Sequence, residues 1–257
     1  MPAPGRATRI ARALLVPVVV LVLWEVISRT GTVSAIIMPA PSKVVVRWWD
    51  YAASGEMLQD AAGSLYRVLG GFAIGAGLAL PLGLLMGAKS WANDLFDPLL
   101  QVLRPIPPIA FIPLAILWFG LGNPPAFFLI ALGAFFPVLV NTIAGVRHVD
   151  AIHLRAARNL GASEWTIFRR VILPSAMPYV LSGMRIGIGV AFIVVIVAEM
   201  TAVNQGLGYR ILEAREYFWS DKIIAGMITI GLIGLAIDGI MGRVTARMLR
   251  WHRGLEG

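Results

Sequence analysis

The segment GASEWTIFRRVILPSAMP, from Gly161 to Pro178, places a glutamate and two arginines between two long apolar stretches. The chain of 257 residues is 58% hydrophobic and only 14% charged, with a mean hydropathy of +0.78. These values lie outside the usual range of soluble globular domains. We therefore interpret the segment as a polar loop between membrane-spanning helices, and the chain as an integral membrane protein.

Apolar runs of about 20 residues, the length that crosses ~30 Å of hydrocarbon as a helix, recur on both sides of this loop. They are Ile10–Ile27, Leu65–Gly87, Leu95–Phe119, Pro125–Val146, Pro178–Val203 and Ile223–Leu249. The runs are continuous and do not alternate with a period of two, so they predict helices and not a β-barrel. The first run could also be a cleavable signal peptide, but it serves equally well as an anchor. The expected fold is all-α, with six transmembrane helices in one membrane domain over residues 1–257.

Two of the predicted spans have an unusual composition. The second has a small residue at every fourth position, which forms one stripe along a helix and lets a neighbouring helix approach closely. These residues are Gly71, Gly75, Ala79, Gly83 and Gly87. The third is rich in proline, so we expect it to be kinked or broken and its freed carbonyls to face protein or water. Its prolines are Pro98, Pro105, Pro107, Pro108 and Pro113.

The distribution of the 22 Lys and Arg residues predicts the orientation of the chain. With the N-terminus in the cytoplasm, thirteen fall on the inner side and seven on the outer side, while Arg104 and Arg185 fall in or near the membrane. The outer seven are Arg29, Lys43, Arg47, Arg67, Arg210, Arg215 and Lys222. Because basic residues favour the cytoplasmic side, both termini are expected there. The net charge of +8 reflects this bias, and we expect no nucleic-acid partner.

The polar loop, at about residues 150–174, has the sequence pattern of two short helices at a bend. Helix-forming residues follow His153, Gly161 is a typical helix stop, and Ser163 is a typical N-cap for a second helix. We expect these helices to protrude on the cytoplasmic side.

The spacing in this loop resembles the EAA loop of the membrane subunits of ATP-binding-cassette importers. That pattern is Glu-Ala-Ala, three residues, Gly, nine residues, Ile, one residue and Leu-Pro. The chain has Ala156-Ala157, Gly161 and Val171-Ile172-Leu173-Pro174 at the same spacing. It departs from the pattern at Arg155, which stands at the acidic position, and mildly at Val171. The arginine puts any salt bridge of the usual glutamate in doubt.

The resemblance implies a coupling helix that docks on a separate ATPase subunit. The implied coupling residues are Arg155, Ala156, Ala157, Gly161, Ala162, Ser163, Phe168, Leu173 and Pro174. The implied partners are a second copy of the chain, two ATPase subunits that bind ATP and Mg²⁺, membrane lipid, and a periplasmic or lipid-anchored substrate-binding protein. The chain itself would hold no cofactor and would not be an enzyme.

Further stretches narrow the resemblance to importers of sulfonates, nitrate and taurine. They are Pro39-Ala40-Pro41-Ser42, Asp97-Pro98, Arg104-Pro105-Ile106-Pro107, Pro113–Gly120, Ala198-Glu199, Gly206-Leu207-Gly208-Tyr209 and Arg250-Trp251-His252. The resemblance implies a permease for a small anion in the bacterial inner membrane. Another small solute, such as a thiamine precursor or bicarbonate, is the alternative.

Four polar residues within the predicted spans are candidates for a substrate pathway: Arg104, Asn141, Arg185 and Glu199. A charge inside a span is costly unless it faces a cavity or a partner, so Arg104 could attract an anion, or else bond a carbonyl freed by the prolines. Arg185 and Glu199 are about 21 Å apart along one helix, too far to pair, and a structural role for both is the alternative. Asn141 either bonds to a neighbouring helix or lines the path.

Two other function classes fit the sequence less well. An ion-coupled secondary transporter would have inverted repeats and intramembrane acids, and the two halves show no such symmetry. A membrane enzyme would need a clustered nucleophile, base or metal set, which we do not find. The stretch GLLMGAKS, from Gly83 to Ser90, resembles a phosphate-binding loop, but Ala88 stands where a glycine must precede the lysine. There is no cysteine, and His148, His153 and His252 lack other ligands nearby, so no metal site is expected.

Overall fold

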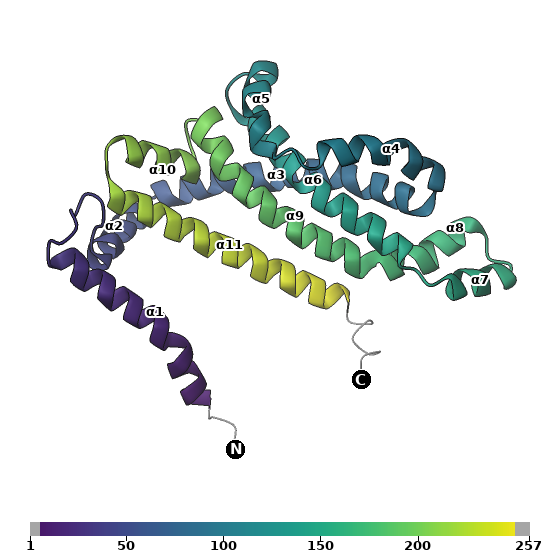
Figure 1. Ribbon diagram of the computed structural model, residues 1–257, viewed down its shortest axis with the longest axis horizontal. Helices are drawn as coiled ribbons and strands as arrows, with labels where there is room; N and C mark the ends of the chain where they lie inside the picture. The colour runs from purple at the N-terminus through teal and green to yellow at the C-terminus, as the bar shows by residue number, and fades with distance from the viewer. Residues whose placement is uncertain (1–5, 250–257) are drawn as a thin grey trace.

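The computed structural model describes residues 6–249, and of residues 6–14 only the helical path (Figure 1). All regular structure in this part of the chain is helical. The helices are α1 (Arg6–Arg29), α2 (Pro41–Ala53), α3 (Glu56–Ala88), α4 (Ser90–Leu103), the 3₁₀ turn η1 (Pro108–Phe111), α5 (Ile112–Phe119), α6 (Asn123–Arg147), α7 (Ala151–Asn159), α8 (Glu164–Ile167), the π-helical turn η2 (Phe168–Ile172), α9 (Leu173–Ala202), α10 (Leu207–Glu216) and α11 (Ser220–Met248). The closing Arg250-Trp251-His252 lies outside the described residues.

Four helical segments among the described residues are long and apolar enough to cross a membrane. They are Glu56–Ala88, Asn123–Arg147, Glu164–Ala202 and Ser220–Met248. The segments Ser90–Leu103 and Pro108–Phe119 pass the same test together, but they are bent by 82°. The first predicted run falls in α1, and the count of six spans stays a prediction.

The core is built from α3, α6 and α9, with α6 packed along both of the others. The predicted stripe of small residues on α3 makes this packing possible. A Cβ atom added to Gly71 would lie 2.6 Å from Ile130 of α6, and one added to Gly87 would lie 2.6 Å from Val146. No side chain fits at such distances, so glycine sets the close approach of the two helices. The expectation of a closely packed second span is confirmed.

The predicted break in the third span is also confirmed. Arg104 is the C-cap of α4, and the chain then turns through Pro105 and Pro107 before η1 begins at Pro108. Proline lacks the N–H that would continue the helix and restricts the residue before it to extended conformations. As a result α5 projects from the bundle at the top of Figure 1.

The bundle has two different ends (Figure 1). We name them the α10 end, where α2 and α10 lie, and the α7 end, where α7 and α8 lie. α3, α6, α9 and α11 run between them, so each end gathers segments that are distant in the sequence.

Candidate functional site

The polar loop forms a helix–turn–helix unit at the α7 end. Its turn is set by Gly161, which has φ +77°. The Gly161 N–H donates to the Arg158 carbonyl (2.9 Å), and the Ala162 N–H donates to the Ala157 carbonyl (3.1 Å). These two bonds make the Schellman motif, which satisfies the last carbonyls of a helix and favours glycine at the left-handed position. The predicted helix stop at Gly161 is confirmed.

The second arm of the loop begins where the sequence predicts. The Ser163 hydroxyl accepts a hydrogen bond from the Thr166 N–H (3.3 Å) and so caps α8. The arm is not a separate short helix, however, because α8 continues through η2 into α9, with Leu173 and Pro174 in the first turn of α9. The loop is therefore continuous with a core helix, and a displacement of α8 displaces α9.

The loop presents apolar and basic side chains to its surroundings. Leu160 is 87% exposed and Trp165, which stacks on Phe168, is 68% exposed. The Arg158 guanidinium and the Glu164 carboxylate, 3.1 Å apart, tie the two arms together. Arg155 is exposed, and its Nε donates to a carbonyl of its own helix at 3.3 Å. Among the described residues Arg155 has no acidic partner, so the glutamate role of the EAA pattern has no equivalent here.

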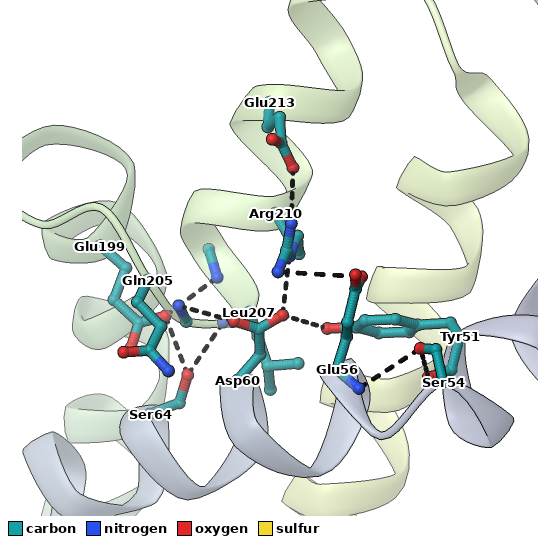
Figure 2. Close-up of polar contacts among 12 residues, drawn as sticks. Tyr51, Ser54, Glu56, Asp60, Ser64, Glu199, Gln205, Leu207, Arg210 and Glu213 are labelled. Carbon is teal, nitrogen blue, oxygen red and sulfur yellow. Dashed lines mark hydrogen bonds and ion pairs between the residues drawn. The ribbon is translucent and has the colours of Figure 1, made fainter.

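At the α10 end, a network of buried polar side chains joins α3, α9 and α10 (Figure 2). Glu199 is fully buried, and its carboxylate lies 2.7 Å from the Arg67 guanidinium, which is almost equally buried. Arg67 also donates to the Asn123 side chain (2.7 Å) and to the Gln205 carbonyl (3.0 Å). Glu199 accepts a further bond from the Gly208 N–H (2.9 Å). The ion pair is thus embedded in hydrogen bonds, as a buried charge requires.

The first N–H groups of α10 and its N-cap are each bound by a side chain of this network. The bonds run from Gly206 to Asp60 (3.1 Å), from Leu207 to Ser64 (3.0 Å) and from Gly208 to Glu199 (2.9 Å). They satisfy donors that a helix start leaves open, and the two carboxylates complement the helix dipole. Gly206 has φ +124°, and a Cβ there would lie 2.5 Å from the Glu199 carboxyl carbon. Only glycine fits at that position.

Asp60 extends the network to α2. It is almost fully buried and accepts hydrogen bonds from the Tyr51 hydroxyl (2.8 Å) and from Arg210 Nε (2.8 Å). Burial and the bond to Asp60 raise the pKa of Tyr51 well above its ordinary value, so the hydroxyl stays a donor. The α10 end is therefore fixed by contacts among four helices.

The structure does not bring together the four residues predicted to line a pathway. Glu199 is fully buried in the network at the α10 end. Arg104 is exposed at the proline bend, where its backbone N–H donates to the Leu100 carbonyl (2.9 Å), and its guanidinium forms no hydrogen bond with the residues that the structure describes. The Asn141 amide donates to the Pro137 carbonyl of its own helix (2.8 Å) and packs where α6 meets Gly183 of α9. Arg185 is exposed and paired with Asp238 of α11.

The sequence analysis placed Arg67 only by its side of the membrane, among the seven outer basic residues, and it missed the network. Arg67 lies inside α3, which begins at Glu56, before the predicted start at Leu65. The sequence did contain a usable pattern: Asp60, Ser64 and Arg67 are spaced i, i+4 and i+7, which places them on one face of a helix.

The bundle combines helices long and apolar enough to cross a membrane with a protruding helical loop at one end and a polar network at the other. The chain belongs to the family of the binding-protein-dependent transport system inner membrane component, whose model matches residues 79–250. It is therefore the permease subunit of an ATP-binding-cassette importer and not an enzyme, and it works with an ATPase and a binding protein.

Relatives of known name agree with this assignment. An Escherichia coli (strain K12) protein named taurine transport system permease protein TauC is 32% identical over 91% of this chain and 87% of its own length. A Bacillus subtilis (strain 168) protein that carries the name of an aliphatic sulfonates transport permease, SsuC, is 39% identical over 96% of this chain and 89% of its own. The nitrate import permease protein NrtB of Leptolyngbya laminosa is 32% identical over 81% of this chain and 78% of its own.

A solved structure shows the same fold. The chain aligns with the MetNI methionine ABC transporter in an inward-facing conformation, with a TM-score of 0.64 over 72% of this chain and 92% of that chain. The sequences are 17% identical, so this likeness concerns the fold alone.

Proposed function

We propose that the chain carries a small oxyanion, an aliphatic sulfonate, taurine or a nitrate-like anion, across the bacterial inner membrane. The observation that carries this proposal is the similarity, over most of the chain, to proteins named as permeases for aliphatic sulfonates, taurine and nitrate. The three solutes share a compact group of oxygen atoms with delocalised negative charge, which a guanidinium binds through parallel N–H donors.

We propose that the helix–turn–helix unit at the α7 end docks on the ATPase. Its exposed Leu160 and Trp165 supply an apolar surface, and Ala156, Ala157 and Gly161 leave room for a partner to approach closely. The continuity of α8 with α9 would pass a movement of the ATPase directly into the core. On this reading the α7 end and both termini are cytoplasmic, and the binding protein, free or lipid-anchored, docks at the α10 end.

We further propose that two copies of the chain assemble with two ATPase subunits and form the path between them. The support lies on α4, whose exposed face has large apolar residues at i, i+4, i+8 and i+11. They are Trp91, Leu95, Leu99 and Val102, between 58% and 68% exposed. Arg104 follows at the proline bend, where a path between copies would pass.

Two experiments test this proposal. Affinity purification of the tagged chain from cells that also express its ATPase should recover both proteins. The mass of the purified complex should correspond to two copies of the chain and two ATPase subunits. Deletion of the chain should abolish growth on ethanesulfonate, taurine or nitrate as a single sulfur or nitrogen source. Normal growth of the deletion strain on all three would overturn the proposed solute class.

A further inference from the structure

A second ion pair lies within the membrane-spanning helices. Arg185 of α9 donates from Nε to one oxygen of Asp238 on α11 (2.7 Å) and from Nη2 to the other oxygen (2.6 Å). This two-pronged geometry is the strongest arrangement for a guanidinium and a carboxylate. It connects α11 to the core helix that continues from the loop at the α7 end.

Unlike the Arg67–Glu199 pair, this pair is open to its surroundings. Its side chains are 48% and 56% exposed, compared with 6% and 0% for Arg67 and Glu199. Arg185 lies about 18 Å along α9 from Leu173, and Asp238 lies about 15 Å along α11 from Met248. Both are flanked by apolar residues on their own helices. Exposed charges at that depth are costly in hydrocarbon and mark cavities or substrate paths.

The face of α9 next to Arg185 is also open. Its exposed residues follow at i, i+4, i+7 and i+11, which is one face of a helix. They are Ser182, Ile186, Gly189 and Ile193. A Cβ added to Gly189 would meet no atom within 4 Å. This face is bordered on one side by α11, through the ion pair, and α9 is also in contact with η1 at the proline bend.

We propose that Arg185 contacts the oxyanion group of the solute during passage, and that the charge of its ion-pair partner, Asp238, sets which solutes the site favours. A guanidinium has five N–H donors, and Asp238 engages two of them. The remaining three can bind a sulfonate or nitrate while the ion pair stays intact. This inference rests on the proposed function and names the two residues that would recognise the solute.

The carboxylate of Asp238 gives the site a charge preference. It repels a solute with a net negative charge, such as ethanesulfonate, and so keeps affinity modest enough for release. It attracts an ammonium group close to the sulfonate, as taurine has. Arg185 and Asp238 together therefore fit a zwitterionic aminosulfonate better than a simple anion.

The test compares initial rates of uptake of labelled ethanesulfonate and taurine by the reconstituted complex, with one binding protein used throughout. Asp238→Asn should raise the ratio of ethanesulfonate to taurine uptake by about threefold or more, the effect of losing one partly exposed charge contact. Arg185→Gln should slow the uptake of both solutes about tenfold, and Arg185→Lys should recover part of that loss because it restores the charge without the fork of donors.

Asp221→Asn is the matched control. Asp221 is also an α11 aspartate paired with an arginine of another helix, Arg47, at 2.9 Å, but it lies at the α10 end. Its substitution should leave the uptake ratio unchanged. An Asp238→Asn complex with the wild-type ratio would overturn the inference. So would an Arg185→Gln chain that loses self-association while its residual uptake keeps the wild-type ratio, because the pair would then belong to an interface between copies. Wild-type complexes that transport none of ethanesulfonate, taurine and nitrate would instead refute the proposed solute class.

Discussion

The buried pair of Arg67 and Glu199 yields a prediction with a defined magnitude. Glu199→Gln removes the negative charge but keeps an oxygen that can accept the Gly208 N–H, so the cap of α10 is preserved. Arg67, with a side chain 6% exposed, is left as a buried charge without its counter-ion. Removing one partner of a buried pair costs about 3–5 kcal/mol. At about 2–4 °C per kcal/mol for a chain of this size, the unfolding midpoint should fall by roughly 10 °C.

The assay is thermal unfolding of the detergent-purified chain, followed by the loss of its monodisperse elution peak. Arg67→Met combined with Glu199→Gln should recover at least half of the loss, because no charge then stays buried. Asp221→Asn breaks a more exposed pair, whose side chains are 43% and 25% exposed, and should cost less than about 1 kcal/mol. A Glu199→Gln midpoint as close to the wild type as that of Asp221→Asn would refute the reasoning, as would strictly additive losses in the double variant.

Three further predictions concern the loop, the topology and the bend. Gly161→Ala should weaken ATPase binding about fivefold in a pull-down titration, because the positive φ costs alanine about 1 kcal/mol. Gly161→Asn should bind more nearly as the wild type does, since asparagine tolerates this conformation better. Equal binding by the wild type and both variants would contradict a role of this turn in docking. Cysteines introduced at Ser163 and Ser54 should react with membrane-impermeant maleimide from the inner and outer sides respectively, and the reverse pattern would overturn the orientation. Arg104→Gln should slow uptake while basal ATP hydrolysis and assembly persist; normal uptake, or failure to assemble, would make Arg104 a structural residue.

The features that the sequence predicted are those governed by local rules. The spacing of Gly71, Gly75 and Gly83 implied a close helix neighbour, and the structure places α6 against them. Proline chemistry implied the break after Arg104, and the left-handed preference of Gly161 implied the turn of the loop. Each of these depends on residues within a few positions of one another.

The features that were missed depend on contacts between distant segments. Arg67 and Glu199 are 132 positions apart, and Arg185 and Asp238 are 53 apart, so no helical periodicity links them. A lone arginine or acid in an apolar run shows that a partner is needed, but not which one. The continuity of α8 with α9 was also missed, because the fifth predicted span begins only at Pro178 and the π-helical turn has no clear sequence pattern.

The measurement that tests the central claim most directly is solute uptake into proteoliposomes that contain the chain, its ATPase and its binding protein. The account predicts that ethanesulfonate or taurine is taken up only when ATP is present on the side of the membrane that holds residues 151–170 and the binding protein is present on the opposite side. It also predicts that Gly161→Pro abolishes this uptake while the protein stays inserted, since proline cannot adopt φ +77° or donate to the Arg158 carbonyl. Uptake that proceeds without ATP on an ion gradient, or at the wild-type rate in Gly161→Pro, would contradict it.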